Sequence, residues 1–519
     1  MPVGLKIEIP SLQYTQVPLL YTMQDWIPGT LELSSKVRYG IGSRGIPLFR
    51  FVPYDTSIGP FAVGCSQRDL FHNVHAIVTP NAANAANAEP SPQSSSSIPI
   101  FRTLLPKATL VQNLGIPNDE TNLQVLLAAY AYDGKKSLRL PKAPPQNIPS
   151  LAEEEFSKRP HVEGITFHID PPGCKDVDDS FSFLETKDRT WRVSINIADV
   201  AAWVKEGSEH DVKASERATS FYSPEGEALV PMFPREISEG AASLRGAEPR
   251  PTLSLQFTWT PGAPEPLTDF QWVEAMATTH TSYTYDEADA AQAQGIKALK
   301  QLSAELDPTN TAQTSHEWVQ NMMILYNRKA GETLRKKGNG ILRRHSAPKA
   351  AALAQWTAID PSLSFLAYEA ATFCLATDED TRHFGLSEVD SYAYASSPIR
   401  RYCDLVNQRI LKGASVAVQQ EIVDALNRRQ KQAKAFSRDL FFMRELATGV
   451  KVQGGLVVAH TDKAFTAFKA YIPAWKRCVK VKCLQDAEDL PPVGSRVSLE
   501  WLCDYEKPNW KEKIIFRMK

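Results

Sequence analysis

Short apolar runs separated by glycine and proline characterise the first part of the chain. Residues 33–78 contain three of them, at residues 48–52, 61–63 and 74–78. Runs of this length between turn-forming residues predict β-strands, so we expect a small twisted β-sheet or barrel. The adjoining residues 81–97, which read NAANAANAEPSPQSSSS, carry too little apolar surface to pack. They predict a disordered insertion over about residues 80–98, between two strands.

The last part of the chain shows the same pattern. Its short apolar runs lie at residues 454–458, 464–472, 477–483, 495–502 and 513–517. This number and length of strands is typical of a five-stranded barrel of the oligonucleotide-binding (OB) type. The aromatic residues Phe465, Phe468, Tyr471 and Trp475 could stack on the bases of a single strand or fill the barrel. Filling the barrel is the favoured interpretation, because alternate strand positions must face its interior.

Helical and extended patterns alternate in the centre. Residues 311–336 and 418–448 have helical spacing with few helix breakers, whereas residues 166–257 are mostly strand-like. A mixed α+β domain is therefore expected there. A chain of 519 residues is too long for one ordinary core. We predict three parts, at residues 1–150, 151–448 and 449–519, with the proline-rich residues 140–149 at the first boundary.

Composition and charge narrow the class of protein only slightly. With 43% hydrophobic and 23% charged residues the chain should fold, and its net charge of −1 does not indicate a nucleic-acid binder. Residues 451–519 carry 13 Lys and Arg against 8 Asp and Glu. A basic segment of this kind is usually a solvated surface, so it favours nucleic-acid binding only weakly.

The seven cysteines are scattered, and none forms a Cys-x-x-Cys pair. This argues against a zinc knuckle or a disulfide framework and indicates a reducing compartment. The first ten residues lack the apolar core of a signal peptide, and no run of about 18 apolar residues occurs. We therefore expect a cytoplasmic protein, or one of another intracellular reducing compartment, without a membrane span.

Residues 167–180 hold the most informative chemistry. Four carboxylates, Asp170, Asp176, Asp178 and Asp179, lie close together on this segment. Carboxylates this close repel one another, so the segment is either a solvated acidic loop, which is the commoner case, or the holder of a hard cation such as Mg²⁺. The Pro-Pro-Gly sequence at residues 171–173 predicts a turn that brings Asp170 to face the Asp178–Asp179 pair.

This segment resembles the acidic motif of the ribonuclease II family, the RNB-domain 3′ to 5′ exoribonucleases that include the catalytic nucleases of eukaryotic exosomes. In that family a Thr-Ile-Asp segment is followed, at the same spacing, by Asp, any residue, and Asp-Asp. Further stretches follow in family order, at residues 197–204, 217–222, 230–239, 243–245, 342–345, 383–386 and 396–404. An ordered series over this length is a specific signal.

The resemblance implies an α+β multidomain protein. An RNB catalytic domain would be flanked by an N-terminal cold-shock or OB-like β-barrel region and a C-terminal S1 barrel, another OB fold. It also implies a hydrolytic, processive, sequence-independent 3′ to 5′ exoribonuclease that degrades single-stranded RNA to nucleoside 5′-monophosphates. Two Mg²⁺ ions would serve, with Mn²⁺ able to substitute. The protein would act as a monomer or within an RNA-degradation complex.

The family motif assigns a role to each aspartate. By this resemblance Asp170 and Asp179 hold one Mg²⁺, while Asp176 or Asp178 recruits the second with the substrate. Asp178 is also counted as a catalytic residue. Tyr222 matches the family tyrosine that contacts the last nucleotide of the RNA. Without the resemblance, a tyrosine that covers a sheet edge would be the favoured interpretation.

Arg400 can also be argued from the residues around it. Ser397 followed by Pro398 is typical of a helix N-cap and first helical position, which predicts Arg400 in the first turn of a helix. Backbone N–H groups there favour an anion, so the guanidinium would clamp a phosphate of RNA. Arg401 is the better partner for Asp404, one turn on. The resemblance gives Arg400 the role of the family's catalytic arginine.

Some positions depart from the family. Gln320 and Asn321 stand where the family usually has Glu-Glu, and Asn339 replaces an aromatic that stacks on bound RNA in bacterial relatives. Weaker retention of RNA of about five nucleotides is expected from the loss of that stacking. Two other functions remain open, a catalytically weak RNB-fold RNA-binding or adaptor protein and a metal-dependent DNA exonuclease or phosphoesterase. The intact aspartates favour the ribonuclease.

Overall fold

The computed structural model describes residues 26–81, 105–135, 156–186, 190–386, 390–415, 417–447, 452–461, 467–482, 490–504, 506–508 and 513–519. Contacts divide the chain into two compact units. The first unit comprises Met1–Ser137 and Leu502–Ile515, and the second comprises Leu138–Trp501 and Phe516–Lys519. Each unit is described by itself.

The first unit contains a closed β-barrel with the strand order β1-β2-β3-β5-β4. Its strands are β1 (Ile27–Leu31), β2 (Leu48–Pro53), β3 (Phe61–Gly64), β4 (Val74–Pro80) and β5 (Lys107–Gly115). The large side chains of Phe49, Phe51 and Phe61 fill its interior. The prediction of a barrel is confirmed. The expected insertion at 80–98 falls between β4 and β5, and residues 82–98 lie outside the described residues.

A helical segment follows this barrel. The helix α1 (Asp119–Leu126) begins after Asn118, whose side chain accepts a hydrogen bond from the backbone N–H of Thr121. Such a cap satisfies a backbone donor that the first turn of a helix leaves without a partner. A π-helical turn, η4 (Leu127–Ala131), continues α1.

A six-stranded sheet forms the centre of the second unit, with the order β12-β11-β8-β7-β6-β13. These strands are β6 (Ile165–Ile169), β7 (Asp179–Glu185), β8 (Trp191–Ala198), β11 (Arg250–Trp259), β12 (Leu267–Ala277) and β13 (Thr281–Tyr283). All neighbours are antiparallel except β13, which runs parallel to β6. The ends of β6 and β7 are joined by the acidic segment.

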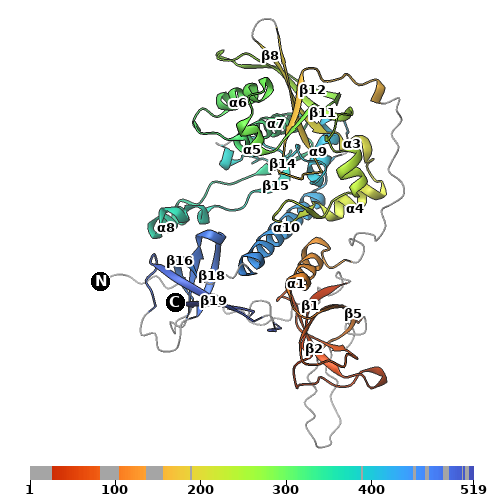
Figure 1. Ribbon diagram of the computed structural model, residues 1–519, viewed down its shortest axis with the longest axis vertical. Helices are drawn as coiled ribbons and strands as arrows, with labels where there is room; N and C mark the ends of the chain where they lie inside the picture. The colour runs from red at the N-terminus through yellow and green to blue at the C-terminus, as the bar shows by residue number, and fades with distance from the viewer. Residues whose placement is uncertain are drawn as a thin grey trace, which may run out of the picture. The chain divides into compact units, whose positions relative to one another are not determined.

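The two faces of this sheet differ in polarity. Phe181, Phe183 and Ile195 belong to a core shared with α6 (Gln294–Leu306) and α7 (Ser315–Lys337), which lie beside the sheet in Figure 1. The alternate residues are polar and buried. Among them the Asn196 amide donates to the Ser182 hydroxyl at 2.8 Å. Hydrogen bonding of this kind removes the cost of burying polar groups.

The second unit contains further elements between β8 and β16 (Val452–His460). They are α3 (Val200–Trp203), α4 (Glu209–Arg217), β9 (Phe221–Tyr222), β10 (Ala228–Val230), η6 (Glu236–Ala241), α5 (Tyr285–Ala290), β14 (Ile341–Arg344), α8 (Ala350–Ile359), η7 (Pro361–Ala367), β15 (Thr372–Leu375), η8 (Phe384–Leu386), α9 (Tyr402–Leu411) and α10 (Gln420–Ala447). The helices predicted at residues 311–336 and 418–448 correspond to α7 and α10. The short helices α3 and α4 interrupt the segment that was predicted to be mostly strands.

A second closed barrel has the order β16-β17-β18-β20-β19. Its strands are β16 (Val452–His460), β17 (Ala467–Ile472), β18 (Arg477–Lys482), β19 (Arg496–Cys503) and β20 (Ile514–Met518). The prediction of five strands is confirmed. Phe468, Tyr471 and Trp475 are all buried, so the favoured interpretation as core residues is confirmed for these three, while Phe465 lies outside the described residues. Tyr471 packs against Leu363 and Phe365 of η7, outside the barrel. Trp475 lies in η9 (Pro473–Trp475) and contacts Phe442 of α10 as well as Trp501 and Phe516.

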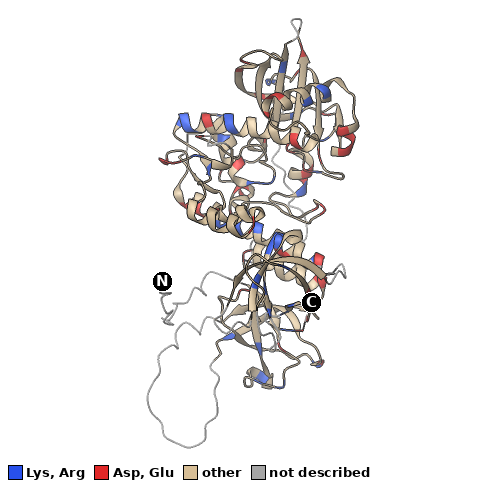
Figure 2. Ribbon diagram, turned by 90° about the vertical axis from the view of Figure 1, so that its left-hand side faces the viewer, with Lys and Arg blue, Asp and Glu red and all other residues tan. Residues whose placement is uncertain are grey.

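Lys and Arg residues (blue) and Asp and Glu residues (red) are interspersed along the ribbon in Figure 2. No helix in the described ranges is long and apolar enough to cross a membrane.

Candidate active site

A cavity of about 730 Å³ lies at the end of the central sheet. All four aspartates predicted to bind metal line it, and so do Tyr222 and Arg400. Its walls come from the acidic segment, from β9 and the turn after it, from α7, and from the residues that precede α9. The fold thus brings together residues that are more than 200 positions apart in the sequence.

The turn at residues 171–173 has the predicted effect. The backbone N–H of Cys174 donates to the carbonyl of Pro171 at 3.1 Å, and Gly173 has a φ of +79°, a conformation that favours glycine. The backbone N–H of Asp170 donates to the carbonyl of Tyr283 at 3.0 Å, which holds Asp170 at the end of β6. Asp179 opens the neighbouring strand β7, so the two ends of the acidic segment meet across the sheet.

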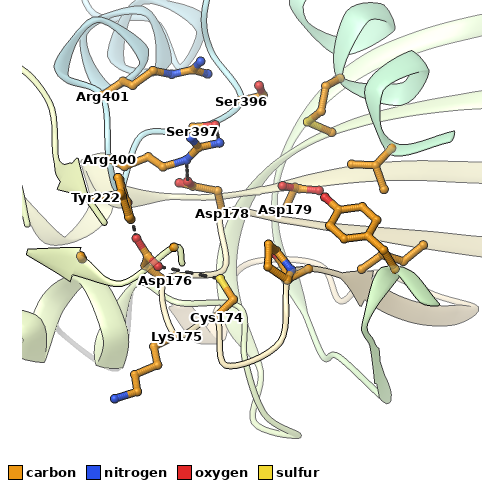
Figure 3. Close-up of a pocket in the computed structure, with 18 of the residues that line it drawn as sticks. Cys174, Lys175, Asp176, Asp178, Asp179, Tyr222, Ser396, Ser397, Arg400 and Arg401 are labelled. Atoms are coloured by element: carbon orange, nitrogen blue, oxygen red, sulfur yellow. Dashed lines mark hydrogen bonds and ion pairs between the residues drawn. The ribbon is translucent and has the colours of Figure 1, made fainter. Parts of the chain in front are cut away.

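Asp178 is buried and held from two directions. Its carboxylate accepts the backbone N–H of Ile399 at 2.9 Å and the Nε of Arg400 at 3.0 Å, as Figure 3 shows for the arginine. Burial raises the pKa of Asp178 to about 7, even though Arg400 and the Ile399 N–H favour the charged form. At neutral pH this group therefore lies close to its own midpoint of titration.

Asp179 points from the same strand end into another part of the cavity (Figure 3). Burial raises its pKa well above the usual range, and the charges of Asp170 and Asp178 add to this effect. Repulsion between neighbouring carboxylates is the condition that a bound cation relieves. The oxygen donors present are those that Mg²⁺ and Mn²⁺ prefer, so the chemistry of this site fits such an ion.

Two of the other carboxylates are engaged by protein partners. The hydroxyl of Tyr222 donates to Asp176 Oδ2, and the thiol of Cys174 lies 3.8 Å from Asp176 Oδ1. Asp170 Oδ2 lies 2.7 Å from the Nδ1 of His168, which stands where the family has threonine. Accordingly, among the residues described, no three His, Cys, Asp or Glu side chains are gathered as a ready-made metal site. The carboxylates share one cavity, but they point to separate partners.

The prediction that Arg400 lies in the first turn of a helix is wrong. The helix α9 begins at Tyr402, and residues 398–400 form a turn before it. The reason is a contact distant in sequence: Arg401 is extended and pairs with Thr219, while the backbone N–H of Ser220 donates to the carbonyl of Arg400 at 2.9 Å. This pairing uses backbone groups that a helix would have needed.

The side chains of Arg400 and Arg401 have different partners, as predicted. Arg401 donates to Asp404 at 2.6 Å. Arg400 also donates from Nη2 to the hydroxyl of Ser397 at 3.1 Å, and 46% of its side chain stays exposed. It lines the cavity and can therefore reach an anion there without leaving Asp178. The pairing of Arg400 with a predicted metal ligand was not foreseen.

Tyr222 lies on β9, where it pairs with Ala228 of β10. Burial, and then the charge of Asp176, raise the pKa of its hydroxyl, which therefore remains a neutral donor. The ring lines the cavity, so it does more than cover a sheet edge. Its predicted contact with RNA remains a prediction.

Tyr285 is a cavity residue that the sequence analysis missed. It begins α5, lines the cavity, and stacks on His316 with 3.6 Å between ring centroids. Burial, followed by Asp179 and Asp170, raises its pKa to about 12. The only local signal was the cap formed by Thr284, which predicts a helix start but says nothing about what faces it.

The three positions that depart from the family lie in different surroundings. Gln320 lines the cavity, whereas Asn321 is buried and donates to the hydroxyl of Ser303 at 2.9 Å. Asn339 accepts the backbone N–H of Val418 at 3.1 Å and is not among the residues that line the cavity. Only Gln320 therefore changes the polarity of the cavity wall.

Residues 161–313 and 300–416 match the family model of the RNB domain, in two overlapping segments. The chain belongs to the RNB-domain family. The matched residues contain the four aspartates, Tyr222 and Arg400, so the family and the cavity are defined by the same part of the sequence.

Relatives of the RNB domain include two eukaryotic nucleases. The DIS3-like exonuclease 2 of Xenopus tropicalis is 31% identical over 204 residues, which is 38% of this chain and 23% of the relative. The exosome complex exonuclease RRP44 of Mus musculus is 24% identical over an alignment of 438 residues, and the match covers 65% of this chain and 45% of the relative. The matched regions thus span less than half the length of either relative.

Two solved structures share the fold. Mycoplasma genitalium RNase R, in a complex with ribose-methylated single-stranded RNA, matches with a TM-score of 0.73 and 15% identity over 99% of this chain and 93% of that one. Yeast Ssd1, described as a pseudonuclease, matches with a TM-score of 0.64 and 17% identity over 89% of this chain and 65% of that one. These similarities show an α+β RNB architecture with barrels at both ends of the sequence.

Proposed function

We propose that this RNB protein is a hydrolytic, metal-dependent 3′ to 5′ exoribonuclease that acts on single-stranded RNA processively and without regard to sequence. The observation that supports this most is the joint placement of four aspartates and Arg400 around one cavity. A solvated acidic loop would not by itself account for a cavity that these carboxylates share with an arginine more than 200 residues away. Family relatives that carry exonuclease names support the same reaction.

Asp170 and Asp179 would hold one Mg²⁺, and Asp176 or Asp178 would join a second with the substrate; Mn²⁺ could replace either. When bound, such ions supply a hydroxide from water and neutralise charge on the phosphate. The raised pKa values of Asp178 and Asp179 mean that these carboxylates must release protons before they can act as ligands.

Arg400 performs a task that needs no metal. Its guanidinium is fixed by Asp178 and Ser397 while nearly half of the side chain remains exposed in the cavity. A planar group fixed in this way can donate to two phosphate oxygens at little further cost in side-chain entropy. It would therefore stabilise the charge that builds on the scissile phosphate.

Tyr222 would position the last nucleotide. Its hydroxyl is fixed by Asp176, which sets the orientation of the ring along the cavity wall. A ring held in this manner can stack on any base, which is consistent with cleavage independent of sequence. Selection of RNA over DNA would come from hydrogen bonds to 2′-hydroxyl groups. The expected products are nucleoside 5′-monophosphates.

The compartment and the assembly in which this activity takes place are also part of the proposal. Six cysteines among the described residues are free thiols, which supports a reducing compartment such as the cytoplasm. The protein would act as a monomer or within an RNA-degradation complex. The RRP44 relative is named as part of an exosome, but less than half of that protein is matched.

A second candidate function is binding of RNA without cleavage. The similarity to the fold of a pseudonuclease favours it, as does the pairing of Asp178 with Arg400. The retention of all four aspartates in the cavity favours the enzyme instead, because a binding protein gains nothing from carboxylates that repel phosphate.

Incubation of the purified chain with 5′-labelled single-stranded RNA tests the proposal. Shortening from the 3′ end with Mg²⁺ or Mn²⁺, absent in EDTA and in Asp178→Asn, is the expected result. DNA of the same sequence should persist. Retention of intact RNA at saturating metal, with binding preserved, would leave the RNA-binding function in its place. Equal cleavage of DNA would indicate the general phosphoesterase.

A further inference from the structure

A second hollow, of about 510 Å³, lies in the same unit as the active site. It shares only Arg401 with the active-site cavity, and its other lining residues differ. One wall is formed by α10, and the other by residues that precede β9, by Phe373 of β15 and by Cys403 of α9. The mechanism proposed above does not use it.

The floor of this hollow is apolar. Ala218, Phe373, Cys403 and Leu426 contribute to it, and each of them is buried as a residue. Thr219 and Gln430 add polar groups at its sides. An apolar floor with a few polar groups around it is the usual composition of a site that holds a small organic ligand, including a nucleoside.

The rim of the hollow is cationic. Lys434 and Arg438 lie one helical turn apart on α10, and both are exposed. Neither forms an ion pair with a residue that the structure describes, and no acidic side chain is among the described residues that line the hollow. Like charges four residues apart destabilise a helix. An anion between these two side chains would remove that cost.

The buried Arg343 adds to the positive potential behind this rim. Arg343 is buried, donates to the side-chain oxygen of Gln430 at 2.6 Å, and places its guanidinium 4.8 Å from the ring centre of Phe373. Burial, and then the charges of Arg343 and Arg438, lower the pKa of Lys434. The desolvation is partial, because the Lys434 side chain is exposed at the rim of the hollow.

We propose that this hollow binds one nucleoside phosphate, with the base and ribose against the apolar floor and the phosphate between Lys434 and Arg438. The ligand has two possible sources. One is a nucleotide within an RNA strand whose 3′ end occupies the active site, and the other is a free nucleoside 5′-monophosphate released by hydrolysis. The choice between them rests on the proposed function, whereas the site itself rests on the charge and shape of the hollow.

The test compares the double variant Lys434→Gln/Arg438→Gln with the control Lys336→Gln/Lys431→Gln. The control removes the same number of exposed cations from α7 and α10, at positions that line neither hollow. Binding of adenosine 5′-monophosphate is measured by calorimetry, and binding of a labelled 20-nucleotide single-stranded RNA by fluorescence anisotropy, both in EDTA. Cleavage with Mg²⁺ is then measured over a range of RNA concentrations.

The two possible sources of the ligand predict different experimental results. If a strand occupies the hollow, the double variant should bind the 20-nucleotide RNA at least tenfold more weakly. Its plot of log affinity against log salt should be flatter by about 0.7, because the one phosphate that the two removed cations neutralise together accounts for about 0.7 of the slope. The KM for RNA should rise while kcat stays unchanged. If a free nucleotide occupies it, the double variant should lose one adenosine monophosphate site and bind RNA normally.

Both probes binding the double variant and the control equally would overturn the inference and leave a solvated basic surface. The result is separable from a failure of the proposed function. A chain that cleaves no RNA but loses a nucleotide site in the double variant would retain this hollow as a binding site and lose the ribonuclease assignment. A chain that cleaves RNA, but whose double variant and control bind both probes equally, would retain the ribonuclease assignment and lose this hollow as a binding site.

Discussion

Asp178→Asn should abolish cleavage and at the same time stabilise the metal-free protein, by an amount that grows with pH. Asp178 is 4% exposed, and burial raises the pKa of its carboxyl from 3.8 to about 7. The folded state therefore favours the protonated form. The cost of ionising this group is absent below about pH 4, grows as the pH rises from 4 to 7, and is complete above 7. Asparagine has no such cost.

The size of the effect follows from that pKa. Each pH unit between the unfolded and folded values changes stability by about 1.4 kcal/mol, so the full cost near pH 8 is on the order of 4 kcal/mol. Between pH 5 and pH 8 it grows by about 3 kcal/mol. Asparagine removes the charged partner of Arg400, but the arginine side chain is 46% exposed and can be solvated. The attraction of Arg400 for the ionised carboxylate is already included in the pKa of about 7, so it is not counted again in the pH dependence.

Hydrogen exchange of the β7 and β8 amides measures this stability without requiring the whole multidomain chain to unfold in one step. The difference between Asp178→Asn and the parent chain, in EDTA, should be larger at pH 8 than at pH 5 by about 3 kcal/mol. Asp424→Asn, an exposed aspartate of α10, is the matched control and should show no such trend. Equal pH dependence in Asp178→Asn and the parent, or cleavage retained by the variant, would refute the reasoning.

Three further results are expected. Arg400→Lys should slow single-turnover cleavage about tenfold or more. Arg401→Lys should have a small effect, because the lysine keeps the ion pair with a neighbouring aspartate. Equal losses of rate in the two variants would remove the distinction between these arginines. Tyr222→Ala should lengthen the final RNA product by several nucleotides without abolishing cleavage, because the loss of a base stack costs about 1 to 3 kcal/mol. An unchanged product length on a denaturing gel would count against contact between Tyr222 and a base. Binding of Mg²⁺ should release protons near neutral pH and strengthen from pH 5 to pH 8, because the pKa values of Asp178 and Asp179 are raised. Calorimetry in buffers of different ionisation enthalpy would detect this, and binding without proton release would contradict it.

Local patterns were sufficient for the elements and for the acidic segment. Turn-forming residues between short apolar runs predicted both barrels, because strand length and turn chemistry are encoded within a few residues. Helical spacing likewise predicted α7 and α10. The turn at residues 171–173 brought the ends of the acidic segment together as expected, since glycine alone readily adopts the backbone conformation found at Gly173.

Tertiary structure decided the geometry of the cavity. Ser397 and Pro398 are typical of a helix start, yet pairing of Arg401 with Thr219 delays α9 until Tyr402. Local preference for a helix start is worth about 1 kcal/mol and yields to backbone pairing with a distant segment. The same long-range packing joins Arg400 to Asp178. It also places Tyr285 in the cavity and opens the second hollow against α10. The sequence alone thus predicted which residues would carry the chemistry. Only the fold, through contacts distant along the chain, determined which partner each one faces.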